Sequence, residues 1–234
     1  MRAVYVPHPA PGTHQRWRDI RWHAARLVPG AVAVWCLVFL TGVVLTHPLS
    51  DAGFSSWEGG ADRWFAGHRS AGWNTLTNVA SLAGDTPAAI ALSVLAFFAL
   101  RLILHRWRES MLLAVSMLGE VAIFSSVASA VGRHRPAVSH LDGSPPTSSF
   151  PSGHTAAATV FYGILVLVVF RYCKRFVWRF LAVAFASFVV LSIGLSRLYR
   201  GMHFPTDICG GIELGLLWIT VTWFVLLRGH ARAE

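Results

Sequence analysis

Six long apolar segments, separated by polar stretches, constrain what this chain can fold into. They cover about 31–46, 87–104, 111–131, 155–170, 180–195 and 206–227. A helix that spans a bilayer needs roughly 20 mostly apolar residues, and few of these segments carry the polar face of a soluble helix. The chain is 54% hydrophobic and 13% charged, whereas soluble domains carry about 25% charged residues. We therefore predict an all-α polytopic membrane protein with a bundle of six transmembrane helices.

The distribution of basic residues predicts how this bundle lies in the membrane. The formal net charge is +9, and most of the 20 Lys and Arg residues lie before the first segment, after the second, after the fourth and after the sixth. The positive-inside rule then places both termini in the cytoplasm. It also explains the charge better than a nucleic-acid partner does. We expect a cytoplasmic polar tail over 1–26, a membrane domain over 27–228 and a short cytoplasmic tail over 229–234.

The first apolar segment and the loop after it yield two further predictions. No convincing small-residue cleavage site follows the first segment, so we interpret it as a retained span. The loop carries Trp57, Trp64 and Trp73 among polar residues, and aromatic side chains favour the membrane–water interface. We predict an interfacial helix over part of 57–80; an ordinary anchoring loop is the alternative.

The loop after the third segment ends in the stretch PSGHT, directly before an apolar run. Ser152 is well placed as a helix N-cap, and Gly153 leaves its backbone N–H accessible. Free N–H groups and the helix dipole favour anions at such a start. The sequence therefore predicts an anion-binding helix terminus next to His154.

A second polar stretch, SRLYRGMHFPTD, joins the fifth and sixth segments. Arg197 ends one predicted helix, and Pro205 suits the first turn of the next. His203 and Asp207 are four residues apart, close enough for a hydrogen bond between their side chains. Two membrane crossings separate this stretch from PSGHT, so both stretches lie on the same face of the membrane.

That face gathers several cations around one carboxylate, in the set Arg133, Arg135, His154, Arg197, Arg200, His203 and Asp207. The balance favours an anionic ligand, because the guanidinium groups would repel a divalent metal ion. Arginine binds phosphate oxygens in a bidentate manner. A histidine beside a carboxylate can act as a nucleophile, and a second histidine can protonate the departing oxygen. The set predicts phosphoryl transfer through a phosphohistidine.

The pattern resembles the type 2 phosphatidic acid phosphatase superfamily, whose motifs are Lys-x6-Arg-Pro, Pro-Ser-Gly-His and Ser-Arg-x5-His-x3-Asp. The second and third motifs match in full, at residues 151–154 and 196–207, and Arg135 begins the Arg-Pro of the first. Position 128, where the first motif calls for lysine, is Ala128. Arg133, His134 or Arg200 could supply the missing charge; altered substrate preference or a weak or inactive enzyme are the alternatives.

The resemblance implies a role for each matching residue. His203 would attack phosphorus, and Asp207 would hold it in the reactive tautomer. His154 would protonate the leaving oxygen and later activate water. The phosphate oxygens would be held by Arg135, Ser152, Gly153 and Arg197. The family uses no metal or other cofactor, and its substrates include undecaprenyl-type diphosphate, phosphatidylglycerophosphate and phosphatidic acid.

The resemblance and the topology together predict a lipid phosphatase in a bacterial plasma membrane, with its active site on the outer face. A phosphotransferase with an acceptor other than water and a non-catalytic binder or transporter of lipid phosphates remain alternatives. Glu120 and Glu213 lie within predicted spans, where a charge is costly, and either a functional role or a structural hydrogen bond would explain them. The spacing of Gly211 and Gly215 predicts close helix packing within the bundle.

Overall fold

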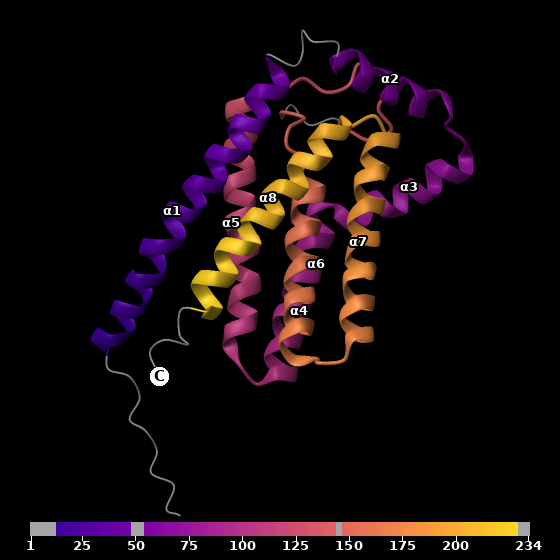
Figure 1. Ribbon diagram of the computed structural model, residues 1–234. Helices are drawn as coiled ribbons and strands as arrows, with labels where there is room; N and C mark the ends of the chain where they lie inside the picture. The colour runs from indigo at the N-terminus through magenta and orange to yellow at the C-terminus, as the bar shows by residue number, and fades with distance from the viewer. Residues whose placement is uncertain (1–12, 48–53, 144–146, 229–234) are drawn as a thin grey trace, which may run out of the picture.

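The computed structural model describes residues 13–47, 54–143 and 147–228, and the regular elements of these residues are all helices (Figure 1). Six of the helices are long and apolar enough to cross a membrane. They are α1 (Thr13–Thr46), α4 (Thr86–Leu104), α5 (Trp107–Val131), α6 (Gly153–Tyr172), α7 (Phe176–Tyr199) and α8 (Pro205–Trp223), which continues into a π-helical turn at Phe224–Arg228. The prediction of a six-helix membrane bundle is confirmed.

The helix α1 extends further toward the N-terminus than the sequence suggested. We predicted a polar tail over 1–26, but α1 already begins at Thr13 and only its part from His23 to Thr46 has the composition of a membrane span. The prolines at positions 7, 9 and 11 all precede its start, and the helix continues through Pro29, which lies between the polar residues and the apolar run. Residues 1–12 and 229–234 of the two predicted tails lie outside the described residues.

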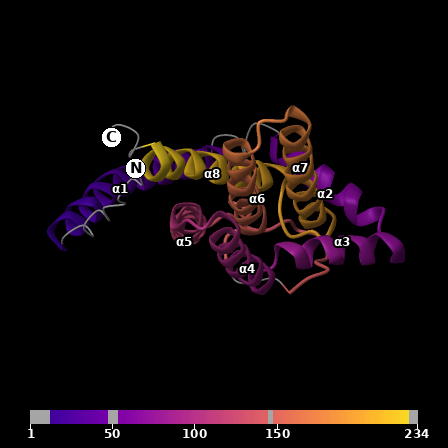
Figure 2. The ribbon, with the colours of Figure 1, turned by 90° about the horizontal axis from the view of Figure 1, so that it is seen from below.

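The loop between the first two spans contains two helices, α2 (Phe54–Gly67) and α3 (Ala71–Gly84), where we predicted one. Figures 1 and 2 show them beside α7, on the side of the molecule opposite α1. Trp57 and Trp64 on α2 are each 57% exposed, whereas Glu58 and Asp62 are buried. The outward aromatic side chains suit an interfacial helix, while the buried acids face the interior of the protein.

The loops that carry the two polar stretches lie at the same end of the bundle, as the count of crossings predicted. Figure 1 shows the end of α5, the start of α6, the end of α7 and the start of α8 together at the top. The helix α5 ends at Gly132, whose φ of 64° belongs to the left-handed region that glycine adopts without strain. This residue turns the chain into the long loop toward α6.

Close packing of α6 against α8 fastens the two stretches together. An added Cβ at Gly211 would lie 2.5 Å from the carbonyl oxygen of Ser152, and one at Gly215 would lie 2.6 Å from the side chain of Thr159. The predicted close approach within the bundle is therefore present. It lets the backbone N–H of Ser152 donate to the carbonyl oxygen of Asp207 at 2.9 Å, so that the starts of both helices are held side by side.

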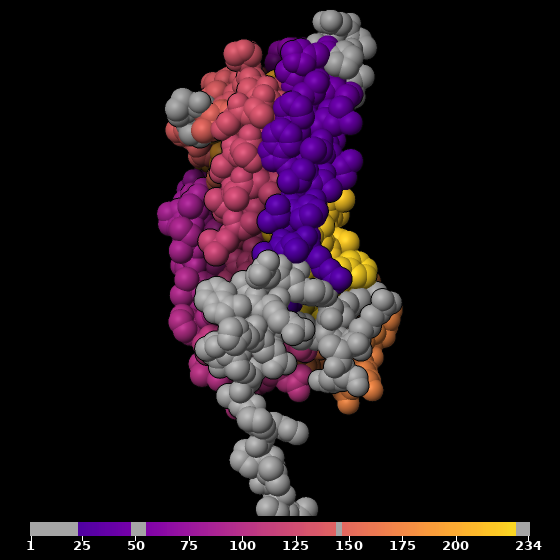
Figure 3. All heavy atoms as spheres, turned by 90° about the vertical axis from the view of Figure 1, so that its left-hand side faces the viewer, coloured from indigo at the N-terminus to yellow at the C-terminus, as the bar shows by residue number. Residues whose placement is uncertain are grey.

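The helix α1 covers the opposite side of the core and packs along α5 and α8 (Figure 3). The core between them contains Val38, Leu113 and Leu214, each fully buried. On this side the Thr41 hydroxyl donates to Glu213 Oε1 at 3.1 Å. This structural hydrogen bond explains the acid of α8 without assigning it a functional role.

Candidate active site

One cavity of about 1200 Å³ opens where the two polar stretches meet. It reaches from the loop end of the bundle down between α4 and α5, with α3 on one side. Its polar end is lined by Arg135, Asp142, Gly153, His154, Arg197 and His203, and the remainder is mostly apolar. The structure therefore brings the two histidines and two of the predicted phosphate-binding arginines to the same space.

His203 lies in the turn between α7 and α8, and a backbone carbonyl orients its ring. Its side chain is only 5% exposed, and its Nδ1 lies 2.7 Å from the carbonyl oxygen of Ser149. Because a carbonyl can only accept, Nδ1 carries the proton and Nε2 is the basic nitrogen of the neutral ring. Burial lowers the pKa of His203 below its ordinary value, although Asp207 opposes this effect, so the ring is neutral at neutral pH.

The position of Asp207 differs from the sequence-based expectation. Its Oδ2 lies 3.7 Å from His203 Nδ1, beyond hydrogen-bond distance, and accepts instead from the backbone N–H of Phe204 at 2.8 Å. Its Oδ1 is paired with Arg133 at 2.6 Å. Asp207 thus caps the start of α8, and the Ser149 carbonyl takes the orienting role that we expected of it.

Arg133 does not supply the charge that the first motif lacks. Its guanidinium lies between Asp207 and Glu58, with 2.5 Å between Nη2 and Glu58 Oε2, and the side chain is 10% exposed. Glu58 also accepts from the hydroxyl of Thr206. Arg133 therefore joins α2 to the start of α8 and does not line the cavity. Ala128 is itself buried in α5.

His154 is held by a side chain from another part of the fold. Its Nε2 lies 2.7 Å from Asp85 Oδ1, in the turn between α3 and α4. The two side chains are 24% and 38% exposed, so this pair is more accessible to solvent than His203. A carboxylate partner stabilises the protonated form of a histidine, which suits a group that gives a proton to a leaving oxygen.

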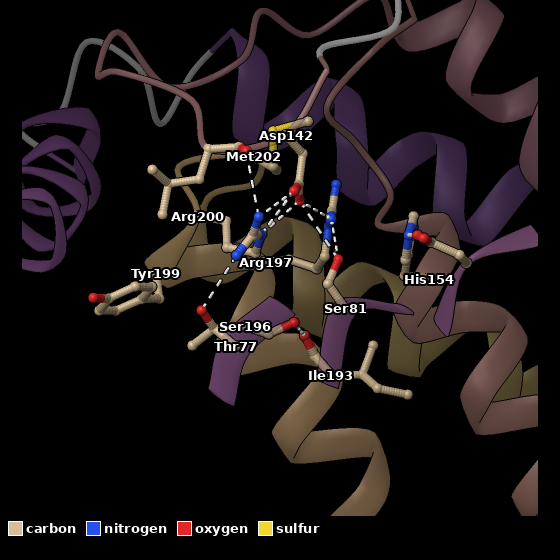
Figure 4. A network of polar contacts seen from close by, with 12 residues as sticks. Thr77, Ser81, Asp142, His154, Ile193, Ser196, Arg197, Tyr199, Arg200 and Met202 are labelled. Atoms are coloured by element: carbon tan, nitrogen blue, oxygen red, sulfur yellow. Dashed lines mark hydrogen bonds and ion pairs between the residues drawn. The ribbon is translucent and has the colours of Figure 1, made fainter. Parts of the chain in front are cut away.

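A carboxylate occupies the space between Arg197, the arginine of the third motif, and Arg200. Asp142 lies between Arg197 and Arg200 (Figure 4), with Oδ2 at 2.7 Å from Arg197 Nη1 and Oδ1 at 2.5 Å from Arg200 Nη2. Arg197 also donates to Ser81 at 2.6 Å. Burial alone would raise the pKa of Asp142, but the hydrogen bonds and charges of Arg200 and Arg197 lower it below its ordinary value. Asp142 is therefore an anion at neutral pH.

The remaining predicted residues divide into those at the cavity and those away from it. Arg135 lines the cavity and donates to the carbonyl oxygen of Met202 at 2.7 Å, while its buried Nε has no partner among the described residues. Gly153 begins α6 at the cavity wall. Ser152 occupies the N-cap position, but its hydroxyl contacts the Thr155 hydroxyl at 3.0 Å and caps no backbone N–H.

Two of the proposed auxiliary cations also lie apart from the cavity lining. His134 is exposed, and its carbonyl oxygen accepts from the Ser149 hydroxyl at 2.9 Å. Arg200 is buried and bound to Asp142. Among the residues that the structure describes, no group of three or more His, Cys, Asp or Glu side chains is arranged to hold a metal ion.

Sequence reasoning missed three acidic residues of this region, Glu58, Asp85 and Asp142. Asp142 is the only acid in the loop between the first and second motifs, and a single acid among arginines is a signal that could have identified it. Glu58 and Asp85 come from the region between the first two spans, where no sequence pattern indicated contact with the motifs.

Comparisons with known proteins agree with the motifs. Residues 109–229 match the family model described as the PAP2 superfamily. Phosphatidylglycerophosphatase B of Bacillus subtilis is 35% identical over 87 residues, which is 35% of this chain and 38% of that protein. Lipid A 1-phosphatase of Rhizobium johnstonii is 27% identical over 244 aligned positions, 92% of this chain and 87% of that protein. The chain thus matches less than half of the first relative and most of the second.

The fold also matches a solved structure. The crystal structure of a transmembrane PAP2-type phosphatidylglycerolphosphate phosphatase from Bacillus subtilis superposes with a TM-score of 0.71, at 19% identity, covering 87% of this chain and 96% of that chain. The likeness extends beyond the matched family region, because it includes most of the helices before α5.

Proposed function

The chain belongs to the PAP2 superfamily, and we propose that it hydrolyses the phosphomonoester or diphosphate headgroup of a membrane lipid through a phosphohistidine on His203. The observation that carries this proposal is that one cavity is lined by His203, His154, Arg135 and Arg197. This cavity continues into an apolar arm between α4 and α5. A headgroup phosphate can occupy the polar end while the lipid's chains fill the arm.

His203 is the proposed nucleophile. With its proton on Nδ1 and directed at the Ser149 carbonyl, Nε2 can form a bond to phosphorus while the bond from phosphorus to the lipid oxygen breaks. Arg135 and Arg197 bind the phosphate oxygens, and the start of α6 at Gly153 adds a favourable backbone N–H. Phosphate competes with Asp142 for Arg197 in this step, because the carboxylate now occupies one of its nitrogens.

His154 is the proposed acid and base. It gives a proton to the departing oxygen, and the leaving group is the lipid alcohol from a monoester or the lipid monophosphate from a diphosphate. It then accepts a proton from water as the water oxygen attacks phosphorus and the bond to His203 breaks, which releases inorganic phosphate. Asp85 stabilises the protonated form of His154 in both steps.

The side of the membrane and the substrate class belong to the same proposal. The distribution of Lys and Arg supports a plasma-membrane protein with cytoplasmic termini and the cavity end on the outer face. The names of the relatives, a phosphatidylglycerophosphatase and a lipid A 1-phosphatase, support glycerophospholipid and saccharolipid phosphates as candidates.

A phosphate-release panel with purified protein in detergent tests this function. Wild-type protein and His203→Ala are compared on phosphatidylglycerophosphate, phosphatidic acid and a polyprenyl diphosphate. We expect wild type to release phosphate from at least one lipid, in EDTA as well as in buffer, and His203→Ala to release none above background. Retained turnover in the variant would remove His203 as the nucleophile, and loss in EDTA restored by a divalent ion would contradict metal independence.

Isotope-labelled water distinguishes hydrolysis from transfer to another acceptor. Hydrolysis places one labelled oxygen in the released phosphate, because the oxygen that attacks phosphorus comes from water. Unlabelled product together with a phosphorylated lipid or sugar would instead support a phosphotransferase.

A further inference from the structure

A buried salt bridge attaches α2 to the end of the bundle that carries His203. Glu58 is 1% exposed, and its Oε2 accepts from Arg133 Nη2 at 2.5 Å. Its Oε1 accepts from the hydroxyl and the backbone N–H of Thr206. On the other side of the same guanidinium, Arg133 Nη1 donates to Asp207 Oδ1 at 2.6 Å. Carboxylates therefore occupy both sides of the planar fork, which fixes its orientation.

The backbone of Arg133 is bound to the segment that orients His203. The Arg133 N–H donates to Ser148 Oγ at 2.9 Å, and the Arg133 carbonyl oxygen accepts from the Ser149 N–H, also at 2.9 Å. The carbonyl oxygen of the same Ser149 accepts from His203 Nδ1 at 2.7 Å. The acceptor that fixes the tautomer of the ring is thus held in place by Arg133.

Arg133 also holds the chain that directly follows His203. Asp207, which accepts from Arg133 Nη1, accepts in addition from the backbone N–H of Phe204 at 2.8 Å. The guanidinium carbon of Arg133 lies 4.5 Å from the centre of the Phe204 ring, which is a cation–π contact. One residue therefore fixes both the acceptor of the ring and the backbone that carries it, and Glu58 holds that residue from the side of α2.

We propose that Glu58 is a positioning residue, which acts through Arg133 to aim His203 Nε2 at the phosphate. This inference rests on the proposed function of the cavity. Glu58 does not line the cavity, so its effect must pass through other residues. Its helix also precedes residues 109–229, which match the family model, so no motif identifies it. A helix outside the motifs therefore takes part in aligning the nucleophile.

Kinetics of Glu58→Gln with phosphatidic acid in detergent micelles test this role. The amide keeps the size of the side chain but removes the charge that holds Arg133. We expect kcat to fall about ten- to hundredfold, as for a small misplacement of a reacting group. KM and the inhibition constant of inorganic phosphate should stay at their wild-type values. A change confined to KM would overturn the inference, because Glu58 would then influence binding and not alignment.

A single-turnover measurement separates misalignment from partial unfolding. With the protein in saturating excess over labelled phosphatidic acid, only folded molecules bind the lipid. The rate constant for release of diacylglycerol is then independent of the folded fraction. Glu58→Gln should lower this rate constant at least as much as it lowers kcat. A wild-type rate constant with fewer active molecules would show a merely structural role and would overturn the inference.

Asp62→Asn is the matched control. Asp62 lies one turn further along α2 and is also 1% exposed, but neither of its carboxylate oxygens is hydrogen-bonded within the described residues. Both variants are measured at pH 6, where Asp62 keeps its proton because burial raises its pKa to about 7. The control should keep the wild-type kcat. A loss as large as that of Glu58→Gln would assign the effect to α2 in general and overturn the specific role.

The route through Arg133 is tested by a double variant. Arg133→Lys keeps the positive charge, but an ammonium group lacks the planar fork that binds two carboxylates. If Glu58 acts through Arg133, adding Glu58→Gln to Arg133→Lys should cause little further loss of kcat. Losses that multiply in full would place the effect of Glu58 elsewhere and reject this route.

A spectroscopic measurement separates this inference from the proposed reaction. Ring-nitrogen NMR of isotope-labelled histidine reports which nitrogen carries the proton, and the His203 signals are identified by their loss in His203→Ala. We expect the Nδ1–H tautomer of His203 in wild type and in Asp62→Asn, and mixed tautomers or shifted signals in Glu58→Gln. That result supports the positioning role even if wild type hydrolyses no lipid, which would reject only the reaction. Unchanged signals in Glu58→Gln would reject the role even where hydrolysis is observed.

Discussion

The two histidines of the cavity are held in different ways. His203 is buried and directed by a backbone carbonyl, that of Ser149. His154 is more exposed and directed by the side chain of Asp85, itself 38% exposed. The first arrangement fixes one tautomer, because a carbonyl cannot donate and the backbone cannot turn away. The second leaves the ring more accessible to substrate and water.

This difference matches the two roles that we propose. A nucleophile needs one fixed orientation and an unprotonated nitrogen, which burial favours. An acid that later acts as a base needs access to the leaving oxygen and then to water. The contrast also shows that the carboxylate four residues after a histidine is not its necessary partner, because Asp207 is engaged by Arg133 and the start of α8.

The largest expected effect is the loss of turnover when each histidine is replaced, and the two losses should differ with the leaving group of the substrate. His203→Ala should lower lipid-phosphate turnover by about 10⁴-fold or more and abolish covalent phosphate on the protein. His154→Ala should lower turnover by about 10²- to 10⁴-fold, but much less for a substrate whose leaving group needs no proton, such as a nitrophenyl phosphate. Acid-quench labelling and phosphate release measure both. Equal losses on the activated substrate would remove the distinction.

The pH dependence of kcat/KM should report the protonation of His203. Because burial lowers the pKa of His203 below its ordinary 6.5, Nε2 remains unprotonated well into the acid range. As pH falls through that lowered pKa, the added proton blocks attack, and kcat/KM should decline about tenfold per pH unit. The midpoint of this acid limb should lie below pH 6.5; a midpoint above it would show that burial does not control the nucleophile.

The partner of His154 should have a smaller effect. Asp85→Asn removes the charge that stabilises the protonated ring and should lower kcat about tenfold, equivalent to about 1.5 kcal/mol for a hydrogen bond to a charged group. KM should change little, because Asp85 is not expected to touch the phosphate. Steady-state kinetics in micelles measure both constants, and an effect confined to KM would argue that Asp85 contacts substrate.

Removal of the Asp142 carboxylate should strengthen the binding of phosphate. Asp142→Asn frees Arg197 from a competing anion and should tighten inhibition by inorganic phosphate about two- to fivefold, as expected for a partly exposed ion pair. The inhibition constant is compared with that of Asp85→Asn, which leaves Arg197 paired. Weaker inhibition in Asp142→Asn would show that Asp142 positions Arg197 for phosphate.

The smallest effect concerns Asp62, a buried acid of α2. Burial, together with Asp207 and Glu58, raises the pKa of Asp62 to about 7. The unfolded chain loses this proton near pH 3.8 and the folded protein keeps it up to about pH 7, so Asp62 lowers the stability progressively as pH rises between these values. Asp62→Asn should raise Tm at pH 8 by a few degrees, at about 2–4 °C per kcal/mol for a chain of this size, and by less at pH 6. Equal changes at both pH values would contradict this assignment.

The sequence was sufficient for the spans and the meeting of the motifs, but not for the partners of individual side chains. Hydropathy determined the six helices, and counting crossings placed His154 and His203 at the same end. Their hydrogen bonds could not be predicted in this way, because Ser149 and Asp85 reach the histidines through the folding of loops. A loop path depends on contacts that no local pattern encodes.

The arginines illustrate the same limit. Arg133, Arg135, Arg197 and Arg200 are all expected at the same end of the bundle, but only Arg135 and Arg197 occupy motif positions. In the structure Arg133 and Arg200 are occupied by acids from α2 and from the long loop, whereas Arg135 and Arg197 line the cavity. The motifs therefore distinguish the two pairs, but the acids that occupy Arg133 and Arg200 could be identified only in the three-dimensional arrangement.

Two sets of helices contribute different walls of the cavity. The histidines come from the start of α6 and the turn before α8, which the glycine contacts join into one rigid block, whereas the lipid arm is walled by α4 and α5. If the proposed function is correct, we expect mutations of residues in that wall to change the lipid preference more than the rate of bond cleavage. A graft of α4 from a relative would transfer chain selectivity while the recipient keeps its own reaction.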